Sequence, residues 1–174
     1  MDCKNLLALD LTGFDTQYVE AMNWMFYNCS SLTSLDLSSF DTQNVENMTA
    51  MFYLCTNLID VDVSSFDTSN VTDISYMFSS CTNLASLYLD NFNTQNVEDM
   101  CYMFYKCKCL ENLDLRKFNT QKVNDMSYMF YDCTGLSEIK FSILFSVKNV
   151  TNMETTIKII TPAIKINIVT LTNT

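Results

Sequence analysis

The chain has 174 residues, of which 48% are hydrophobic, so it carries enough apolar side chain to bury a continuous core. Its formal net charge of −10 argues against nucleic acid or anionic lipid as a partner, because phosphates repel such a surface. It contains 2 Gly and no His, which removes glycine-rich phosphate loops and the usual general base near neutral pH. No run of 18 apolar residues is present, so we expect no membrane insertion.

The sequence repeats with a fixed period of 26 residues. The unit reads C-x-x-L-x-x-L-x-L-x-x-F-[DN]-T-x-x-V-x-x-M-x-x-M-F-x-x, and six cysteines mark its start: Cys3, Cys29, Cys55, Cys81, Cys107 and Cys133. Such a period predicts stacked units that share one core. We predict a single solenoid over residues 1–156, with about five repeats plus a decayed sixth that follows one inserted residue. Residues 157–174 lose the pattern and are predicted to form a degenerate tail or cap.

Within each unit the hydrophobic period changes. Leu35 and Leu37 alternate with polar residues, which is the period of a short strand. After Asp41-Thr42, apolar residues recur at steps of three and four from Val45 to Cys55, which is typical of one face of a short helix. The Asp-Thr pair can form the turn and cap the helix through side-chain hydrogen bonds, without glycine.

These elements predict an α/β fold, a right-handed solenoid like that of leucine-rich repeats. Short parallel strands would lie about 4.8 Å apart on the concave face. Short helices would lie on the convex face, and because their axes need about 8–10 Å, we expect the array to curve.

The repeat resembles that of a known family. The run Met51-Phe52…Cys55-Thr56-Asn57-Leu58…Phe66-Asp67-Thr68-Ser69-Asn70-Val71-Thr72-Asp73 is similar to the repeat of BspA-type leucine-rich surface proteins, the class found in mycoplasmas and many host-associated bacteria. The resemblance covers residues 3–153 and implies a cell-surface or secreted protein that acts in adhesion, with no catalytic residue. We identify no signal peptide or anchoring motif in this chain, so we also consider a fragment of a longer surface protein and a cytoplasmic chain.

The cysteines and aspartates allow metal or disulfide alternatives. Repeat cysteines fall on the inward stripe, so we predict a ladder of buried, reduced thiols, with Cys101 and Cys109 as the exposed ones. Calcium could bridge an outward strand column of carboxylates, but that column lacks carbonyl loops, so we expect no metal. The column comprises Asp10, Asp36, Asp62 and Asp114. A second column interchanges Asp with Asn, which favours turn hydrogen bonds; it comprises Asp15, Asp41, Asp67, Asn93 and Asn119.

An aromatic stripe is the most informative candidate site. On the predicted helix, the positions two before and one after the repeat Phe point outward, and eight of these ten are Tyr or Trp. They are Trp24, Tyr27, Tyr53, Tyr76, Tyr102, Tyr105, Tyr128 and Tyr131. One interpretation is that the rings cover the core between units. The other is an exposed binding ridge, since Tyr and Trp dominate binding hot spots.

The features together predict a non-enzymatic surface-protein repeat module for protein or glycan binding, in adhesion to host or neighbouring cells. The alternatives are an architectural spacer within a longer surface protein and an intracellular protein-interaction scaffold. Candidate binding residues are the eight aromatic ones and, on the strand face, Asp36, Asp62 and Tyr88. The strand face is acidic and suits basic or hydroxyl-rich partners. We expect no cofactor, metal or catalytic residue, and the solenoid ends offer a surface for self-association.

Overall fold

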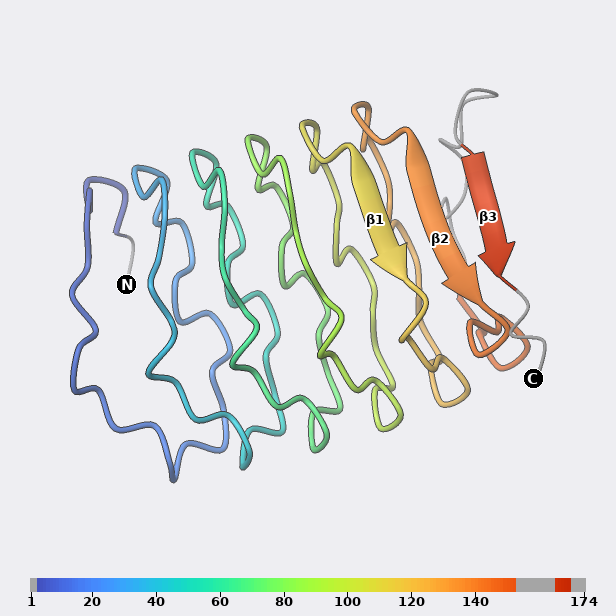
Figure 1. Ribbon diagram of the computed structural model, residues 1–174, viewed down its shortest axis with the longest axis horizontal. Coiled ribbons are helices and arrows are strands. Elements are labelled where there is room, and N and C mark those ends of the chain that lie inside the picture. Colours follow the sequence, from blue (N-terminus) through green and yellow to red (C-terminus); the bar gives the residue numbers. More distant parts are fainter. Residues whose placement is uncertain (1–2, 153–164, 170–174) are drawn as a thin grey trace.

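The computed structural model describes residues 3–152 and 165–169. The chain winds in coils that stand side by side in a row (Figure 1). Parallel β-bridges connect one position of each coil to the same position of the next, in the order Ala21, Asn47, Asp73, Asp99, Asp125, Asn152. The step is 26 residues up to Asp125 and 27 for the last bridge, which accommodates the inserted residue. One sequence repeat therefore forms one coil.

The strands lie on one side of the coils, which we call the strand face. β1 (Asn112–Leu115), β2 (Glu138–Ser142) and β3 (Lys165–Val169) form a parallel sheet in the order β1-β2-β3 (Figure 1). Leu113 pairs with Ile139, and both side chains are buried, as the alternating pattern predicts. β3 belongs to the segment predicted as a tail or cap and pairs with β2; the remainder of that segment from residue 157 lies outside the described residues.

The predicted helices are absent from residues 3–152 and 165–169, so this part of the local prediction is wrong. In their place, each coil has a series of tight turns on its other side, which we call the turn face. The Met51 N–H bonds to the Met48 carbonyl at 3.3 Å, and the Cys55 N–H to the Phe52 carbonyl at 3.1 Å. Between these, the Phe52 N–H donates to the Met77 carbonyl of the next coil at 2.9 Å. Alternate N–H groups thus bond within the coil and between coils.

The turns depend on a left-handed backbone at two non-glycine positions of each coil. These residues have φ between 55° and 65° and are Trp24, Asn28, Ala50, Leu54, Tyr76, Ser80, Tyr102, Lys106, Tyr128 and Asp132. Each costs about 1–2 kcal/mol relative to the right-handed region, so the hydrogen bonds between coils must offset that cost. The curved array was predicted because helices need a wider spacing than strands. Since both faces are joined by backbone hydrogen bonds between coils, with similar spacing, that reason does not apply.

The core lies between the two faces as columns of equivalent apolar side chains. Phe rings of the turn face stack with centroids 5.4–6.1 Å apart; they are Phe26, Phe52, Phe78, Phe104 and Phe130. Leu32, Leu37 and Val45 and their equivalents through the fifth coil are buried around this stack. Each coil therefore covers the apolar surface of the next, which a single coil could not do alone.

Buried threonines connect the coils at the turn after the strand. The Thr68 hydroxyl donates to the Asn93 carbonyl at 3.1 Å and accepts the Asn93 N–H at 2.8 Å. The same pair of bonds recurs in the other coils, from Thr16, Thr42, Thr94 and Thr120. One hydroxyl thus satisfies both backbone groups of one residue in the next coil, a role that requires a donor and an acceptor on the same atom.

The residue before each threonine forms the predicted turn. The Asp67 carboxylate accepts the Ser69 N–H at 2.9 Å, and the Asn119 side-chain carbonyl accepts the Gln121 N–H at 3.1 Å. Asn replaces Asp without loss because only a side-chain oxygen is needed, so the prediction of turn hydrogen bonds is confirmed, although no helix follows.

The cysteine ladder is confirmed. Cys29, Cys55, Cys81, Cys107 and Cys133 are buried free thiols, whereas Cys3 is half-buried. From Cys55 onward, each ladder thiol donates to the Phe carbonyl of the preceding coil at 2.9–3.1 Å. Burial raises the pKa of the Cys55 and Cys133 thiols to about 12. Cys109 is exposed as predicted, but Cys101 is half-buried.

We predict that Thr68→Val destabilises the stack by about 1–3 kcal/mol, because it leaves both backbone groups of Asn93 without the hydroxyl. Thr68→Ser retains the hydroxyl and should cost less than about 1 kcal/mol, the contribution of one methyl group. Urea unfolding followed by circular dichroism measures both. Equal destabilisation by Thr68→Val and Thr68→Ser would show that the two hydrogen bonds of the Thr68 hydroxyl contribute nothing to stability.

We predict that maleimide labels Cys109 first in the native protein and Cys3 and Cys101 more slowly. The five buried ladder thiols should react only in denaturant, because burial removes access and raises the pKa of Cys55 and Cys133. Mass spectrometry after timed quenching reads the order. A native mass lower by about two hydrogens per bond would instead reveal disulfides between coils.

Candidate functional site

The eight predicted aromatic side chains come together in one row along the turn face, which we call the aromatic ridge. The row runs from Trp24 at one end to Tyr128 and Tyr131 at the other. Centroid distances between neighbouring rings of the ridge are 4.6–6.0 Å. The ridge thus links five successive coils through side chains alone.

Parallel stacking determines which part of each ring faces solvent. Tyr76 and Tyr102 stack at 4.6 Å and 5°, and Tyr102 and Tyr128 at 4.7 Å and 14°. Faces stacked in this way are covered by their neighbours, so the ridge offers ring edges and hydroxyl groups. These tyrosines are half-buried, which means that the rings both cover the coils and form an outer surface. The two sequence-based interpretations, rings that cover the core and rings that form an exposed ridge, therefore apply to different parts of the same side chains.

Trp24 differs from the other rings of the ridge. Its side chain is 46% exposed, and its plane lies at 79° to Tyr27 and 67° to Tyr53, so it is not stacked in parallel on either. A large, partly exposed indole with a polar N–H is the residue type most enriched at binding hot spots.

Two of the ten ridge positions lack a ring, and both are fully buried. They are Ala50 and Ser79, each with an exposed fraction of 0%. Tyr53 contacts both Trp24 and Tyr76, so the row continues past Ala50 by crossing between the two columns. The buried Ser79 hydroxyl has no hydrogen-bond partner, which is energetically unfavourable.

The backbone explains why the ridge projects from the coil. Trp24, Tyr76, Tyr102 and Tyr128 occupy the first of the two left-handed positions, at the tip of a tight turn. Sequence reasoning missed this because aromatic residues are uncommon at positive φ, and no local signal marks it. The outward direction was predicted from helical geometry that the chain does not have.

Charged groups lie beside the ridge. The Lys106 ammonium lies 4.9 Å from the centre of the Tyr105 ring, a cation–π contact that the sequence did not suggest. Within the ridge, burial raises the pKa of Tyr76 to about 12, with smaller contributions from Cys101, the neighbouring tyrosines and Asp99. The Tyr76 hydroxyl therefore remains protonated, and a donor, throughout the ordinary pH range.

One cluster near the ridge has metal-ligand chemistry. Ligand atoms of Asp99, Cys101 and Asp125 all lie within 4.8 Å of one another, in half-buried positions. Burial raises the pKa of Asp99, and the adjacent Asp73 and Asp125 raise it further. Desolvation raises the pKa of Cys101, as do its hydrogen bond to Asp99 and the nearby carboxylates. This cluster was not identified in the sequence, because Asp125 comes from the coil after that of Asp99 and Cys101.

The remaining predicted residues lie on the strand face. Asp36 and Asp62 are exposed, and each accepts the N–H of the serine two residues later, at 3.0 and 2.8 Å. These bonds from serine lower the pKa of both carboxyl groups. Tyr88 is 73% exposed on the same face. The predicted binding residues therefore form two separate groups.

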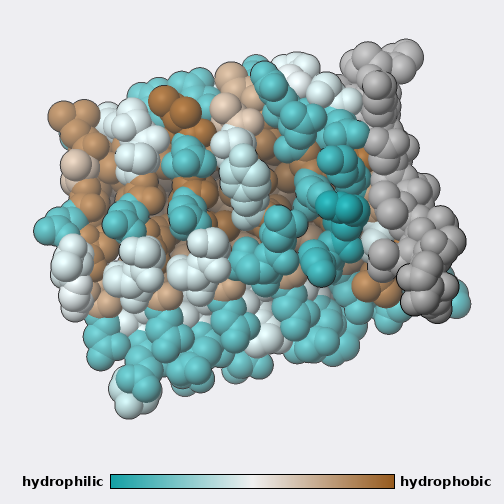
Figure 2. Space-filling view, viewed as in Figure 1, coloured by the Kyte–Doolittle hydropathy of each residue, from teal (hydrophilic) through white to brown (hydrophobic). Residues whose placement is uncertain are grey.

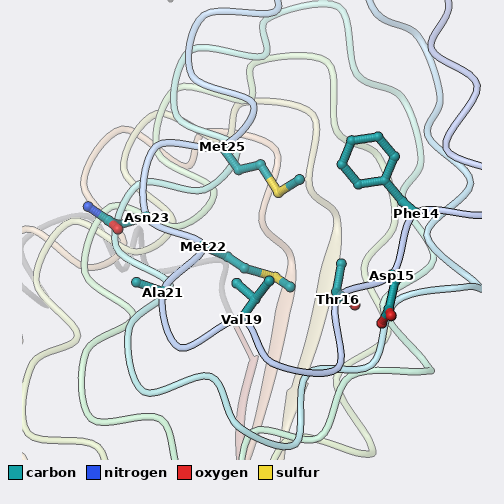
Figure 3. Close-up of a pocket in the computed structure, with 8 residues that line it drawn as sticks. All are labelled: Phe14, Asp15, Thr16, Val19, Ala21, Met22, Asn23 and Met25. Atoms are coloured by element: carbon teal, nitrogen blue, oxygen red, sulfur yellow. The ribbon is translucent and has the colours of Figure 1, made fainter.

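A hollow of about 270 Å³ lies at the first coil, and Figure 3 shows Phe14 and Met25 facing one another across it. Both side chains are exposed, at 55% and 37%, whereas Phe40 and Met51, their equivalents in the second coil, are buried. The hollow is the end of the apolar core, at positions that an adjacent coil covers elsewhere in the stack. It contains no group of polar side chains that would suggest a catalytic site.

A family model described as "Mycoplasma protein of unknown function, DUF285" matches residues 1–85 and 55–167. The chain belongs to this family. The two overlapping matches agree with the repeated coils of this DUF285 protein. No curated protein and no solved structure shows a significant match. Among the described residues there is no helix long and apolar enough to cross a membrane.

We predict that Tyr102→Ser destabilises the protein by about 2 kcal/mol, because it removes a half-buried ring that stacks on two others. Tyr102→Phe retains the stack and should cost less than about 1 kcal/mol. Thermal unfolding of the two variants separates stacking from hydroxyl effects. If Tyr102→Ser unfolds at the wild-type temperature, the ridge has no structural role.

Proposed function

We propose that this DUF285 chain is a non-enzymatic repeat module of a surface protein. It binds a protein or a glycan through the aromatic ridge and so attaches the protein to host or neighbouring cells. We also propose that its coils are a variant of the leucine-rich type of BspA-like proteins, with turns in place of helices. The observation that carries the binding proposal is the unbroken contact row of eight partly exposed rings across five coils.

The rigidity of the ridge supports this function. Stacked rings have already lost their rotational freedom before a partner arrives, so ordering them on binding costs little. Tyr and Trp combine a large apolar area with a polar group, which suits a partner that carries both apolar and hydroxyl surface. Half-buried rings on a backbone-bonded scaffold offer that area without a hinge or loop closure.

Catalysis has no comparable support. The chain contains no His, and the hollow at the first coil is lined mainly by apolar side chains, with Asp15, Thr16 and Asn23 as its polar ones. The charged cluster beside the ridge has raised pKa values at Asp99 and Cys101, which leaves the thiol protonated and a poor nucleophile.

The proposal predicts that replacing three partly exposed rings of the ridge weakens partner binding by at least about tenfold, because each hot-spot ring contributes about 2 kcal/mol. The test variant is Trp24→Ala, Tyr105→Ser and Tyr131→Ser together. Serine is tolerated in this column, since Ser79 occupies it in the third coil. Binding is measured by surface plasmon resonance against immobilised extracellular-matrix proteins and by a glycan array.

Tyr18→Ser is the matched control, because Tyr18 is 81% exposed and lies outside the ridge. Circular dichroism establishes that the triple variant folds. Wild-type binding that survives the triple change in a folded protein would contradict the ridge as the site. Absence of wild-type binding to every ligand tested would favour the architectural spacer.

A further inference from the structure

Tyr88 interrupts a regular column of the strand face. The outward strand position carries an aspartate in the first, second, third and fifth coils, whereas the fourth carries Tyr88. Its side chain is 73% exposed, and it forms no ring contact within the described residues. In contrast to the stacked rings of the ridge, Tyr88 leaves its ring faces open to a ligand.

A hollow lies directly beside this ring. It has a volume of about 360 Å³ and is lined by Asp60, Val61, Asp62, Val63, Ser64 and Tyr88. Figure 2 shows the strand face, on which rows of hydrophilic side chains alternate with apolar ones. The side chains of Val61 and Val63 are buried in the core behind the hollow, and the exposed carboxylates of Asp60 and Asp62 line it.

The carboxylates on the two sides of Tyr88 differ in their partners. On the C-terminal side, Asp114 pairs with Arg116 at 2.6 Å and Glu138 with Lys140 at 3.4 Å. On the N-terminal side, neither Asp60 nor Asp62 has an ion-pair partner within residues 3–152. Uncompensated negative charge is therefore concentrated in the hollow beside the open ring.

We propose that Tyr88, Asp60 and Asp62 form a site for an arginine side chain of a basic polypeptide. A planar guanidinium stacks on an aromatic face and forms two parallel hydrogen bonds with a carboxylate, which matches a ring beside a pair of acids. An anionic ligand is repelled by the same carboxylates. The site goes beyond the proposed function, because it lies on the opposite face from the ridge and has its own ligand chemistry.

The local hydrogen bonds keep the site charged and in place. The Asp62 carboxylate accepts the Ser64 N–H at 2.8 Å, and hydrogen bonds from Ser64 lower the pKa of Asp62. The Ser86 hydroxyl of the fourth coil lies 3.5 Å from the Asp60 carboxylate. Both acids are thus oriented by the coils before a ligand arrives.

The experiment titrates a hexa-arginine peptide into the full chain at low salt by isothermal calorimetry. Tyr88→Asp installs the residue that other coils carry at this position, so the fold should tolerate it. If Tyr88 stacks on arginine, Tyr88→Asp should bind the peptide about two- to fivefold more weakly than the wild type, which is the contribution of an exposed cation–π contact. This loss is expected even though the substitution adds a negative charge. If the peptide binds only through the net negative charge of the chain, Tyr88→Asp should bind it more tightly. The direction of the change therefore distinguishes a specific site from attraction by net charge.

Asp62→Asn removes the charge but retains an oxygen for the Ser64 N–H, and it should also weaken binding. Asp41→Asn is the matched control, because it removes one charge at a turn outside the hollow, in a column that accepts Asn. A hexa-citrulline peptide, which lacks the charge, should not bind.

Three results would each overturn the site. They are no binding of hexa-arginine to the wild-type chain, equal or tighter binding by Tyr88→Asp, and equal losses for Asp62→Asn and Asp41→Asn. The ridge variant Trp24→Ala, Tyr105→Ser and Tyr131→Ser should retain wild-type affinity for the peptide. Failure of the ridge proposal is therefore distinguishable from failure of this one.

Discussion

Backbone hydrogen bonding between successive coils is the interaction on which the rest of this structure depends. A helix satisfies its N–H and C=O groups internally, but the turns here leave alternate groups that only a neighbouring coil can satisfy. Each residue therefore faces the residue one repeat further on, and its side chain must pack against the equivalent side chain of the neighbouring coil. Phenylalanine rings stack, the threonine hydroxyl bridges the next backbone, and the cysteine thiol reaches a carbonyl of the preceding coil.

The aromatic ridge is a consequence of the same constraint on the outside of the coil. Tyrosines in register stack at nearly the distance between coils, as Tyr76, Tyr102 and Tyr128 show at 4.6 and 4.7 Å. Their left-handed backbone is strained, and the ladder that flanks it provides the compensating hydrogen bonds. A surface of this kind is rigid because its side chains are held by the scaffold that displays them.

The sequence predicted the features that follow from the 26-residue repeat, but not the backbone conformation within each repeat. The 26-residue step, the buried cysteines and the turn hydrogen bonds of Asp67 and Asn119 follow from spacing and residue chemistry. The helix was wrong because overlapping four-residue turns place apolar side chains inward at the same steps of three and four. The eight aromatic side chains nevertheless lie together in one row of ring contacts, whereas Ala50 and Ser79, which the helical geometry also placed outward, are buried.

Departures from the repeat are the places where binding specificity can arise. A perfectly periodic ridge would offer a long partner the same contacts at every coil, so the partner could shift by one coil without loss. Ala50 and Ser79 each leave one of the two ring positions of their coil without a ring, and Trp24 ends the ridge with a ring that is not stacked in parallel. A partner shifted by one coil would therefore meet different contacts. On the strand face, Tyr88 separates uncompensated carboxylates from paired ones. The regular columns thus hold the coils together, while these few exceptions distinguish one position along the stack from the next.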